Sequence, residues 1–354
     1  MHLRWKQVAI AFMALPFVVL VAAWIGFFNV GASTGHWKIT EWFLHFAMRS
    51  AVRTYALAVE SPERLPREGI QPAAAHFARG CAICHGAPGE PRSPVARAML
   101  PQPPDLSRVV GTWKDAELFR IVKHGVRFTG MPAWPNQARD DEVWAMVAFL
   151  RDLPAMKPAA YRLLAYGDVP LEQGRAGSFE GALAECSRCH GADGMGRSAL
   201  TPILAGQSEA YLVESLRAYF EGSRASGVMQ LAVKTVDPEH MPALARHFAM
   251  LPRDRSTGAE GARARRGALL ARTGRPSDKI PACWSCHAGD DRNPIFPDLM
   301  GQPAPYIAMQ LHLFQESKRG GTRFSHLMTS AAKNLSEADI DDVATYFSRA
   351  AEEN

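Results

Sequence analysis

Six cysteines are the residues of this chain best suited to chemistry, and all of them lie in three Cys-x-x-Cys-His pentapeptides. Two thiols at this spacing, followed at once by a histidine, are the attachment pattern of c-type haem. The thiols add across the haem vinyl groups, and the histidine becomes an axial ligand of the iron. We therefore predict three covalently bound haem c groups, attached through Cys81, Cys84, Cys186, Cys189, Cys283 and Cys286, with His85, His190 and His287 as iron ligands.

A structural zinc site is the competing interpretation, because Cys-x-x-Cys pairs also form zinc knuckles. Two knuckles that share one ion usually lie near each other. Here the pairs are roughly a hundred residues apart, which is the spacing of whole domains. Each pair also carries its histidine in the same place. The pattern favours haem.

A methionine is the predicted second iron ligand in each unit. Met131 is preferred to Met99, Met146 and Met156 because it lies in the loop sequence Thr-Gly-Met-Pro. Met229 is preferred to Met195, Met241 and Met250, and Met328 to Met300 and Met309, because both precede the last predicted helix of their unit. The competing ligands are His124, His240 and His326. Histidine–methionine ligation would raise the reduction potential.

The N-terminal region predicts a membrane anchor at residues 1–32. Residues 8–30 contain no charged side chain, and a segment of this length can cross a bilayer. Arg4 and Lys6 precede this segment and place the N-terminus in the cytoplasm. A signal peptide cleaved near Gly31-Ala32-Ser33 is the alternative. Residues 33–67 predict an amphipathic connector that lies in the membrane interface, packs on a partner, or packs on the first haem domain.

The remainder divides into three predicted haem domains, at residues 68–157, 170–255 and 256–354, with a short linker from Pro158 joining the first two. Helices are expected at residues 71–80, 115–124 and 140–153 of the first domain. The second and third domains are an internal repeat, in which Pro202 to Gln207 corresponds to Pro297 to Gln302. Ser336 and Asp339 predict a capping box at the last helix.

The order of helix, Cys-x-x-Cys-His, loop, helix, methionine and C-terminal helix resembles the class I cytochromes c. This resemblance implies an all-α fold, with one transmembrane helix followed by three cytochrome c domains. The second and third domains together resemble the tandem di-haem cytochromes c4, and the first resembles the cytochrome c domains of bacterial dehydrogenases and oxidases. The resemblance also implies that a proline carbonyl supports each proximal histidine: Pro202, Pro297, and either Pro103 or Pro104.

The expected function is electron transfer, with no catalytic residues. The formal net charge of +5 comes with no basic run interleaved with aromatics, so no nucleic-acid partner is expected. The expected location is the bacterial inner membrane, with a single span and with the haem domains in the periplasm. There the chain would serve an integral respiratory complex, such as a terminal oxidase, and a soluble or peripheral redox protein. The alternatives are the cytochrome subunit of a membrane alcohol or aldehyde dehydrogenase and a haem enzyme with an open iron position.

Overall fold

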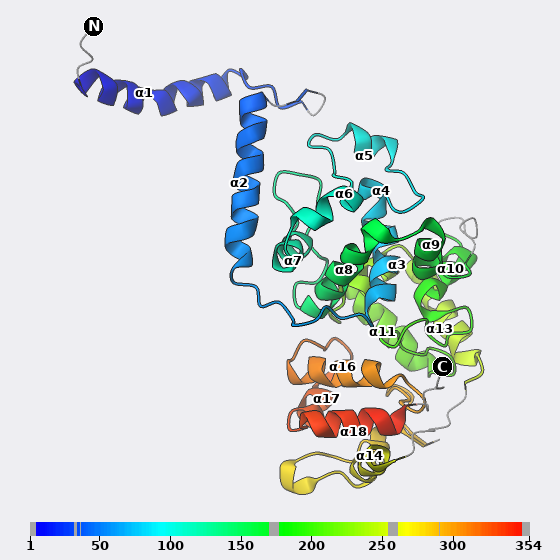
Figure 1. Ribbon diagram of the computed structural model, residues 1–354. Coiled ribbons are helices and arrows are strands. Elements are labelled where there is room, and N and C mark those ends of the chain that lie inside the picture. The colour runs from blue at the N-terminus through cyan, green and yellow to red at the C-terminus, as the bar shows by residue number, and fades with distance from the viewer. Residues whose placement is uncertain are drawn as a thin grey trace.

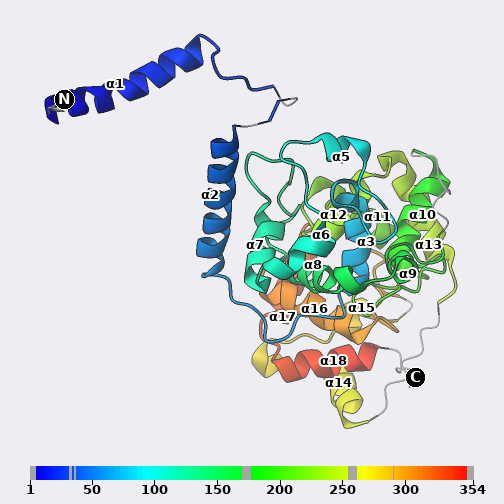
Figure 2. The same cartoon turned by 45° about the horizontal axis from the view of Figure 1, so that its top comes forward.

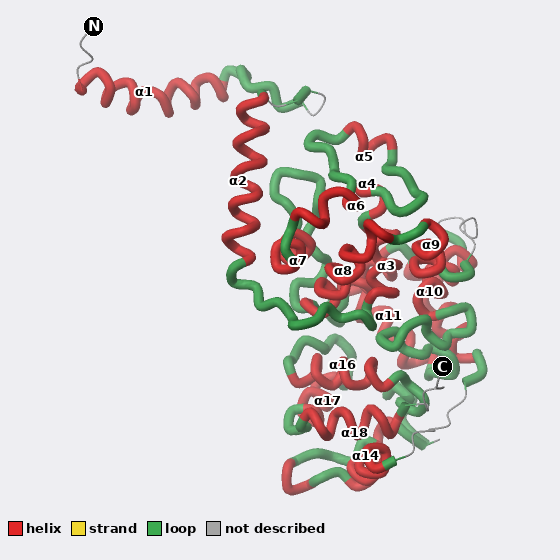
Figure 3. The backbone as a smooth tube through the Cα atoms, in the orientation of Figure 1, coloured by secondary structure: helices red, strands yellow, loops and turns green. Residues whose placement is uncertain are grey.

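The computed structural model describes residues 5–31, 34–35, 37–169, 177–253, 261–289 and 291–348. Throughout these residues the regular elements are helices, and the extended backbone is limited to isolated bridges (Figure 3). The all-α prediction is confirmed. Several predicted features lie outside the described residues: Arg4, the cleavage site at Ala32-Ser33, and the junctions before the second and third domains at residues 170–176 and 254–260.

Helix α1, Trp5–Trp24, is the long apolar segment at the N-terminus. It extends away from the rest of the molecule (Figure 1). None of its residues is buried, and its mean hydropathy reaches 2.2. Its length and composition suffice to cross a membrane. A signal sequence meets the same criteria.

Helix α2, Lys38–Ala56, packs its second half against α7, Asp115–His124, in the first predicted domain. The guanidinium of Arg120 lies 4.9 Å from the centre of the Tyr55 ring, and Arg49 lies 4.8 Å from that of Trp113. The first half of α2 instead exposes a row of large apolar side chains: Ile39, Trp42, Phe43 and Phe46. One half of the predicted connector therefore packs on the first domain, and the other half is open to solvent or to a partner.

The first domain is built on α3, which leads into the first cysteine pair. Its elements are α3 (Ile70–Gly80), α4 (Ala82–His85), α5 (Pro94–Ala98), α6 (Leu106–Val109), the 3-10 turns η1 (Val110–Thr112) and η2 (Leu153–Ala155), α7, α8 (Asp140–Asp152) and α9 (Pro158–Tyr166). Phe77, Phe149 and Tyr161, from α3, α8 and α9, are fully buried against one another. The prediction of a linker from Pro158 is wrong for residues 158–166. These residues form a helix because Tyr161 and Ala165 complete the core.

The second and third domains share the order of a helix leading into the cysteine pair, a middle helix, a short helix and a last helix, and they differ in their short turns (Figures 1 and 2). In the second domain these are α10 (Phe179–His190), α11 (Glu209–Glu221), α12 (Gly227–Lys234), η3 (Pro238–His240) and α13 (Met241–Met250). In the third they are α14 (Ala262–Thr273), η4 (Pro276–Asp278), α15 (Trp284–His287), α16 (Ala304–Gln315), α17 (Ser325–Ala332) and α18 (Glu337–Phe347). Met229 lies on α12 and Met328 on α17, so each predicted ligand is carried by a short helix ahead of the last one.

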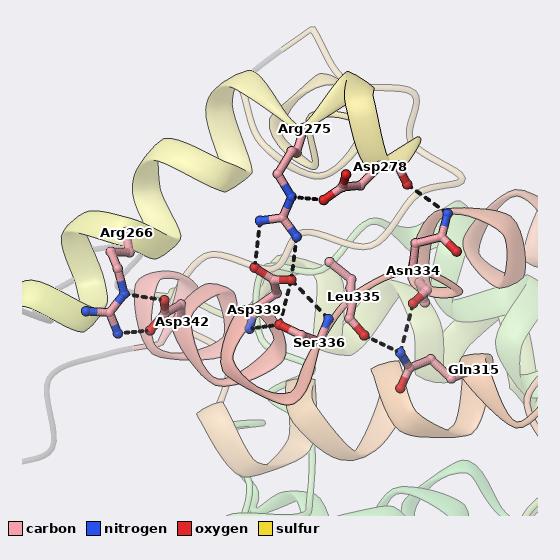
Figure 4. A network of polar contacts seen from close by, with 10 residues as sticks. Arg266, Arg275, Asp278, Gln315, Asn334, Leu335, Ser336, Asp339 and Asp342 are labelled. Carbon is pink, nitrogen blue, oxygen red and sulfur yellow. Dashed lines mark hydrogen bonds and ion pairs between the residues drawn. The ribbon is translucent and has the colours of Figure 1, made fainter.

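A network of ion pairs and caps holds the third domain together along α14 and α18 (Figure 4). Arg275 donates to both carboxylate oxygens of Asp339, at 3.0 and 2.7 Å. Asp339 also accepts from the backbone N–H of Ser336, and the Ser336 hydroxyl accepts from the backbone N–H of Asp339. This is the predicted capping box, and it is confirmed. The bidentate arginine ties the start of α18 to the segment that enters the third cysteine pair.

We predict that Asp339→Asn destabilises the third domain at pH 7 by about 0.5–1 kcal/mol, the usual worth of a charge in the first turn of a helix. The hydrogen bonds from Arg275 lower the pKa of Asp339 to about 2. A depressed pKa stabilises the fold above the ordinary carboxyl value, and this contribution disappears as the pH falls toward 2. The difference between variant and parent in urea unfolding should therefore shrink over that range. Asp341→Asn, on the exposed side of α18, is the matched control. It should leave the free energy of unfolding unchanged both at pH 7 and as the pH falls toward 2.

Candidate haem sites

Each predicted proximal histidine is fixed by a hydrogen bond from its Nδ1 to a proline carbonyl. The distances are 2.9 Å from His85 to Pro104, 3.1 Å from His190 to Pro202 and 3.0 Å from His287 to Pro297. A donor at Nδ1 leaves Nε2 unprotonated in the neutral ring, which is the nitrogen available to a metal. The structure also decides between the two candidate prolines of the first domain, because the Pro103 carbonyl accepts from Arg92 instead.

The proximal histidines lie at helix ends, where burial keeps them neutral. His190 is the last residue of α10, and Gly191 follows with a φ of 77°, a conformation that favours glycine. Burial lowers the pKa of His190 to about 4, and it also lowers the pKa values of His85 and His287. At neutral pH the three rings are therefore in the form that binds iron.

The third domain brings its two predicted iron ligands face to face. The Nε2 atom of His287 lies 3.4 Å from the Sδ atom of Met328. The competing ligand, His326, is exposed on the same helix. This pairing matches the donor set of a histidine–methionine haem site.

The second domain places Met229 on α12, and the competing side chains of His240 and Met241 are engaged elsewhere. His240 Nε2 lies 3.0 Å from the Gly177 carbonyl. Met241 is buried in the last helix, and Met250 is 79% exposed. Met229 itself is half-buried. Among the described residues no direct contact joins Met229 to His190, so this axial assignment remains a prediction.

Met131 lies in a tightly closed loop at the end of α7. Its backbone N–H donates to the Thr129 hydroxyl at 3.1 Å, and its carbonyl accepts from the Val126 N–H at 3.2 Å. Of the competing residues, Met146 is buried in the core, whereas the methyl of Met99 packs against Gly130, beside Met131. In the described part of the chain no direct contact links Met131 to His85, and this ligand too remains a prediction.

Comparison with known proteins identifies the family. The family model for cytochrome c oxidase, cbb3-type, subunit III matches residues 68–150, and that for cytochrome c matches residues 266–350. Cytochrome c-552 of Acidithiobacillus ferridurans is 37% identical over 174 residues, which is 47% of this chain and 73% of the relative. The chain belongs to the class I c-type cytochromes. Membership implies covalently bound haem c.

Two further relatives show that this cytochrome contains a di-haem segment of the c4 type. Cytochrome c4 of Pseudomonas aeruginosa is 32% identical over 177 residues, covering 49% of this chain and 87% of the relative. The thiosulfate dehydrogenase electron acceptor of Thiomonas intermedia is 36% identical over 173 residues, covering 46% of this chain and 77% of the relative. The similarity to the cytochromes c4 noted in the sequence is confirmed.

Within this cytochrome, the loops that support the second and third proximal histidines hold each other. Gln302 accepts from the Ile203 N–H at 3.0 Å and donates to the Ile203 carbonyl at 2.8 Å. Gln207 does the same to Asp298, at 2.7 and 2.9 Å. Ile203 and Asp298 directly follow the prolines that support His190 and His287. The two proximal sides are thus joined through buried backbone bonds across a pseudo-twofold interface.

A cluster of arginine and tyrosine side chains lies at the same interface, and its charge shows whether these residues are suited to bound haem. Arg224 follows Tyr211, and Arg319 follows Tyr306, by the same thirteen residues. Arg224 is 3% exposed and donates to the Ser215 hydroxyl at 3.0 Å, while the buried Nε of Arg319 has no hydrogen-bond partner.

This cluster has an excess of positive charge. In the described part of the chain no carboxylate pairs with Arg224 or Arg319. Burial alone would raise the pKa of Tyr211, but the two arginines beside it lower it to about 8. Haem carries two propionate carboxylates, and buried guanidinium groups are suitable partners for them. The residues fit haem, and Arg224 and Arg319 are the groups that would receive the propionates.

The sequence pattern indicates the correspondence of Gln207 and Gln302 without a role for them, and the arginines were not predicted. The equal spacing of Tyr211 to Arg224 and Tyr306 to Arg319 was the signal that could have found them. Charged residues in matching positions of two repeats are more informative than either one alone.

We predict that the two glutamines protect opposite amides. Gln302→Ala should speed hydrogen exchange at the Ile203 N–H, and Gln207→Ala should do so at the Asp298 N–H. Each change leaves a buried donor without a partner, at a cost of about 1–3 kcal/mol. Gln315→Ala is the matched control, because among the described residues the Gln315 side chain bonds the Ala332 and Leu335 carbonyls, both within its own domain. An Ile203 amide that exchanges equally fast in all three variants would contradict the reciprocal arrangement.

Proposed function

We propose that this cytochrome is a membrane-anchored carrier with three haem c groups, which relays electrons from domain to domain on the periplasmic side of the inner membrane. The three cysteine pairs support the count of three. In each domain the thiols would hold the haem, the histidine supported by proline would ligate one side of the iron, and Met131, Met229 or Met328 the other. Haem bound in this way exchanges single electrons as its iron alternates between the ferric and ferrous states.

The observation that carries this proposal is the series of contacts from the first domain through the second to the third. Arg188 lies in the second Cys-x-x-Cys-His motif, and its guanidinium donates to the carbonyls of Ala75 on α3 and Ala165 on α9. The Gln71 side chain donates back to the Arg188 carbonyl at 3.2 Å. The second motif therefore packs directly against the helix that leads into the first motif.

A small cavity lies at the same junction. It has a volume of about 30 Å³, and Cys189 lines it together with His76 of α3 and Leu231 of α12. The other face of the second domain meets the third through the reciprocal glutamines. The middle domain thus contacts both of its neighbours through the segments that carry or support its own predicted haem ligands. This is the arrangement that a linear relay requires.

Membrane attachment and partners complete the proposal. The exposed apolar helix α1 supports an anchor. The likeness of the first domain to subunit III of the cbb3-type oxidase supports delivery of electrons to a terminal oxidase near the membrane. Relatives named as thiosulfate dehydrogenase electron acceptors support entry of electrons from a periplasmic dehydrogenase at the outer end. Purification with the native membrane partner would separate this role from that of a dehydrogenase subunit.

Replacing Met328 tests the axial assignment. Met328→Ala should remove roughly a third of the methionine–iron charge-transfer absorbance and lower the potential of one haem, since the thioether favours ferrous iron. Intact mass should still show three covalent haems, because the cysteines are unchanged. His326→Ala is the control, and its spectrum should match the parent. The opposite pattern, with absorbance changed only in His326→Ala, would give the ligand role to His326.

Disabling the middle domain tests the linear order. With Cys186→Ala and Cys189→Ala, redox equilibration between the first and third domains should fall to the rate seen between separate molecules. The same pair of changes at Cys283 and Cys286 is the control and should leave equilibration between the first two domains intact. Stopped-flow reduction of dilute protein would measure both rates. Equilibration at the native rate across the disabled domain would contradict the linear order and show that each domain exchanges electrons independently.

A further inference from the structure

The helix that carries Met229 begins against the first domain. The N-terminal end of α12 consists of Ser226, its N-cap, followed by Gly227. The Ser226 hydroxyl accepts from the backbone N–H of Met229 at 3.1 Å, and it donates to a carboxylate oxygen of Glu142 at 2.5 Å. The Gly227 N–H donates to the other oxygen of Glu142 at 2.6 Å. A carboxylate of α8, in the first domain, therefore caps the methionine helix of the second.

Glu142 is itself held in place by two neighbours in the first domain. Arg139 Nη1 lies 3.2 Å from one carboxylate oxygen, and the Trp134 indole N–H donates to the other at 3.2 Å. The side chains of Arg139 and Glu142 are only 7% and 10% exposed. Arg139 also donates to the Ala225 carbonyl at 2.9 Å, just ahead of α12. Both oxygens of Glu142 thus join a partner in the first domain to a partner in the second.

The close fit extends to the backbone at Gly227. A Cβ atom added there would overlap the indole of Trp134, which is 5% exposed. Glycine therefore allows the start of α12 to lie directly against the ring. The Asn136 side chain adds a bond at 3.4 Å to Gln230, one residue after Met229. We call Trp134, Arg139 and Glu142 the α12 clamp.

The third domain has a different arrangement. The N-cap of its methionine helix α17, Phe324, makes no side-chain cap, and Glu214 of the second domain accepts from the Arg323 N–H one residue ahead of it. The two repeats are otherwise matched in helix order and in the supports of their proximal histidines. Among the described residues, the carboxylate at α12 bonds a backbone N–H of the helix itself, whereas the carboxylate at α17 bonds the chain ahead of the helix.

We propose that the α12 clamp positions Met229, so that the first domain fixes the axial ligation, and with it the redox potential, of the second. The inference rests on the axial role proposed above for Met229. Glu142 acts as a positioning residue: it holds the backbone N–H groups of Gly227 directly and of Met229 through Ser226. Loss of the clamp frees the start of α12 and loosens the bond that the thioether sulfur makes. Weaker thioether ligation lowers the potential of that haem.

The test uses the full-length, haem-loaded protein with Glu142→Ala and the milder Glu142→Gln, whose amide oxygen still accepts one hydrogen bond. Hydrogen exchange of the segment 226–231 should rise by about tenfold in Glu142→Ala, since two donors lose their acceptor, and by less in Glu142→Gln. The segment 325–330 of the third domain should be unaffected. Asp140→Asn is the matched control, because Asp140 lies on the same turn of α8 but pairs with Lys123.

Spectra and potentials decide whether the role is positional. The methionine–iron absorbance and one of the midpoint potentials should fall in Glu142→Ala, partly recover in Glu142→Gln and stay native in Asp140→Asn. Native exchange of segment 226–231 in Glu142→Ala would overturn the clamp. Faster exchange with native absorbance and potentials would overturn the positioning role and leave a packing contact. Met229→Ala separates the two proposals: if it leaves the absorbance intact, the assignment of Met229 as ligand has failed.

Discussion

The hydrogen bond from each proximal histidine to a proline carbonyl is the interaction on which the rest of the structure depends. It fixes the tautomer of His85, His190 and His287, and it ties each cysteine motif to the loop that follows it, 10 to 19 residues further along the chain. In the second and third domains that loop continues directly into a residue held by the glutamine of the other domain. The local requirement of one ring nitrogen thus becomes a constraint on how two domains pack.

The interface between the c4-like domains contains two kinds of polar group, which differ in whether the protein itself supplies their partners. The glutamine bonds are complete, since Ile203 and Asp298 each have both backbone groups bonded by the opposing side chain. The charges of the two arginines are not balanced by the protein, since no carboxylate of the described residues pairs with Arg224 or Arg319. Buried positive charge of this kind is costly without a counter-charge. The protein can therefore pack its backbone seam by itself, and the propionates of bound haem would supply the counter-charge for the arginines.

Sequence alone predicted the parts that depend on local chemistry. The cysteine motifs, helix α7 at its observed bounds, the capping box of Ser336 and Asp339, and the correspondence of the two repeats could all be read from spacing and residue type. Helix α9 was missed because a segment that begins with Pro158 looks like a linker. Burial of Tyr161 against Phe77 and Phe149 decides its structure instead. Glu142 is one of three acidic residues in the first turn of α8, a common position for a carboxylate that does not by itself indicate a contact with another domain. Its partners in the second domain lie more than eighty residues away, and no periodicity signals such a contact.

The three predicted methionine ligands are supported in three physically different ways. Met131 lies in a loop closed by its own hydrogen bonds to Thr129 and Val126. Met229 starts a helix held by the neighbouring domain, and Met328 lies on a helix whose first turn has no side-chain cap. Donor atoms of one kind, held with unequal rigidity, need not give equal potentials, because ligand placement, burial and hydrogen bonding all contribute. If all three methionines serve as ligands, near-repeats would in this way obtain distinct electron affinities without a change of ligand.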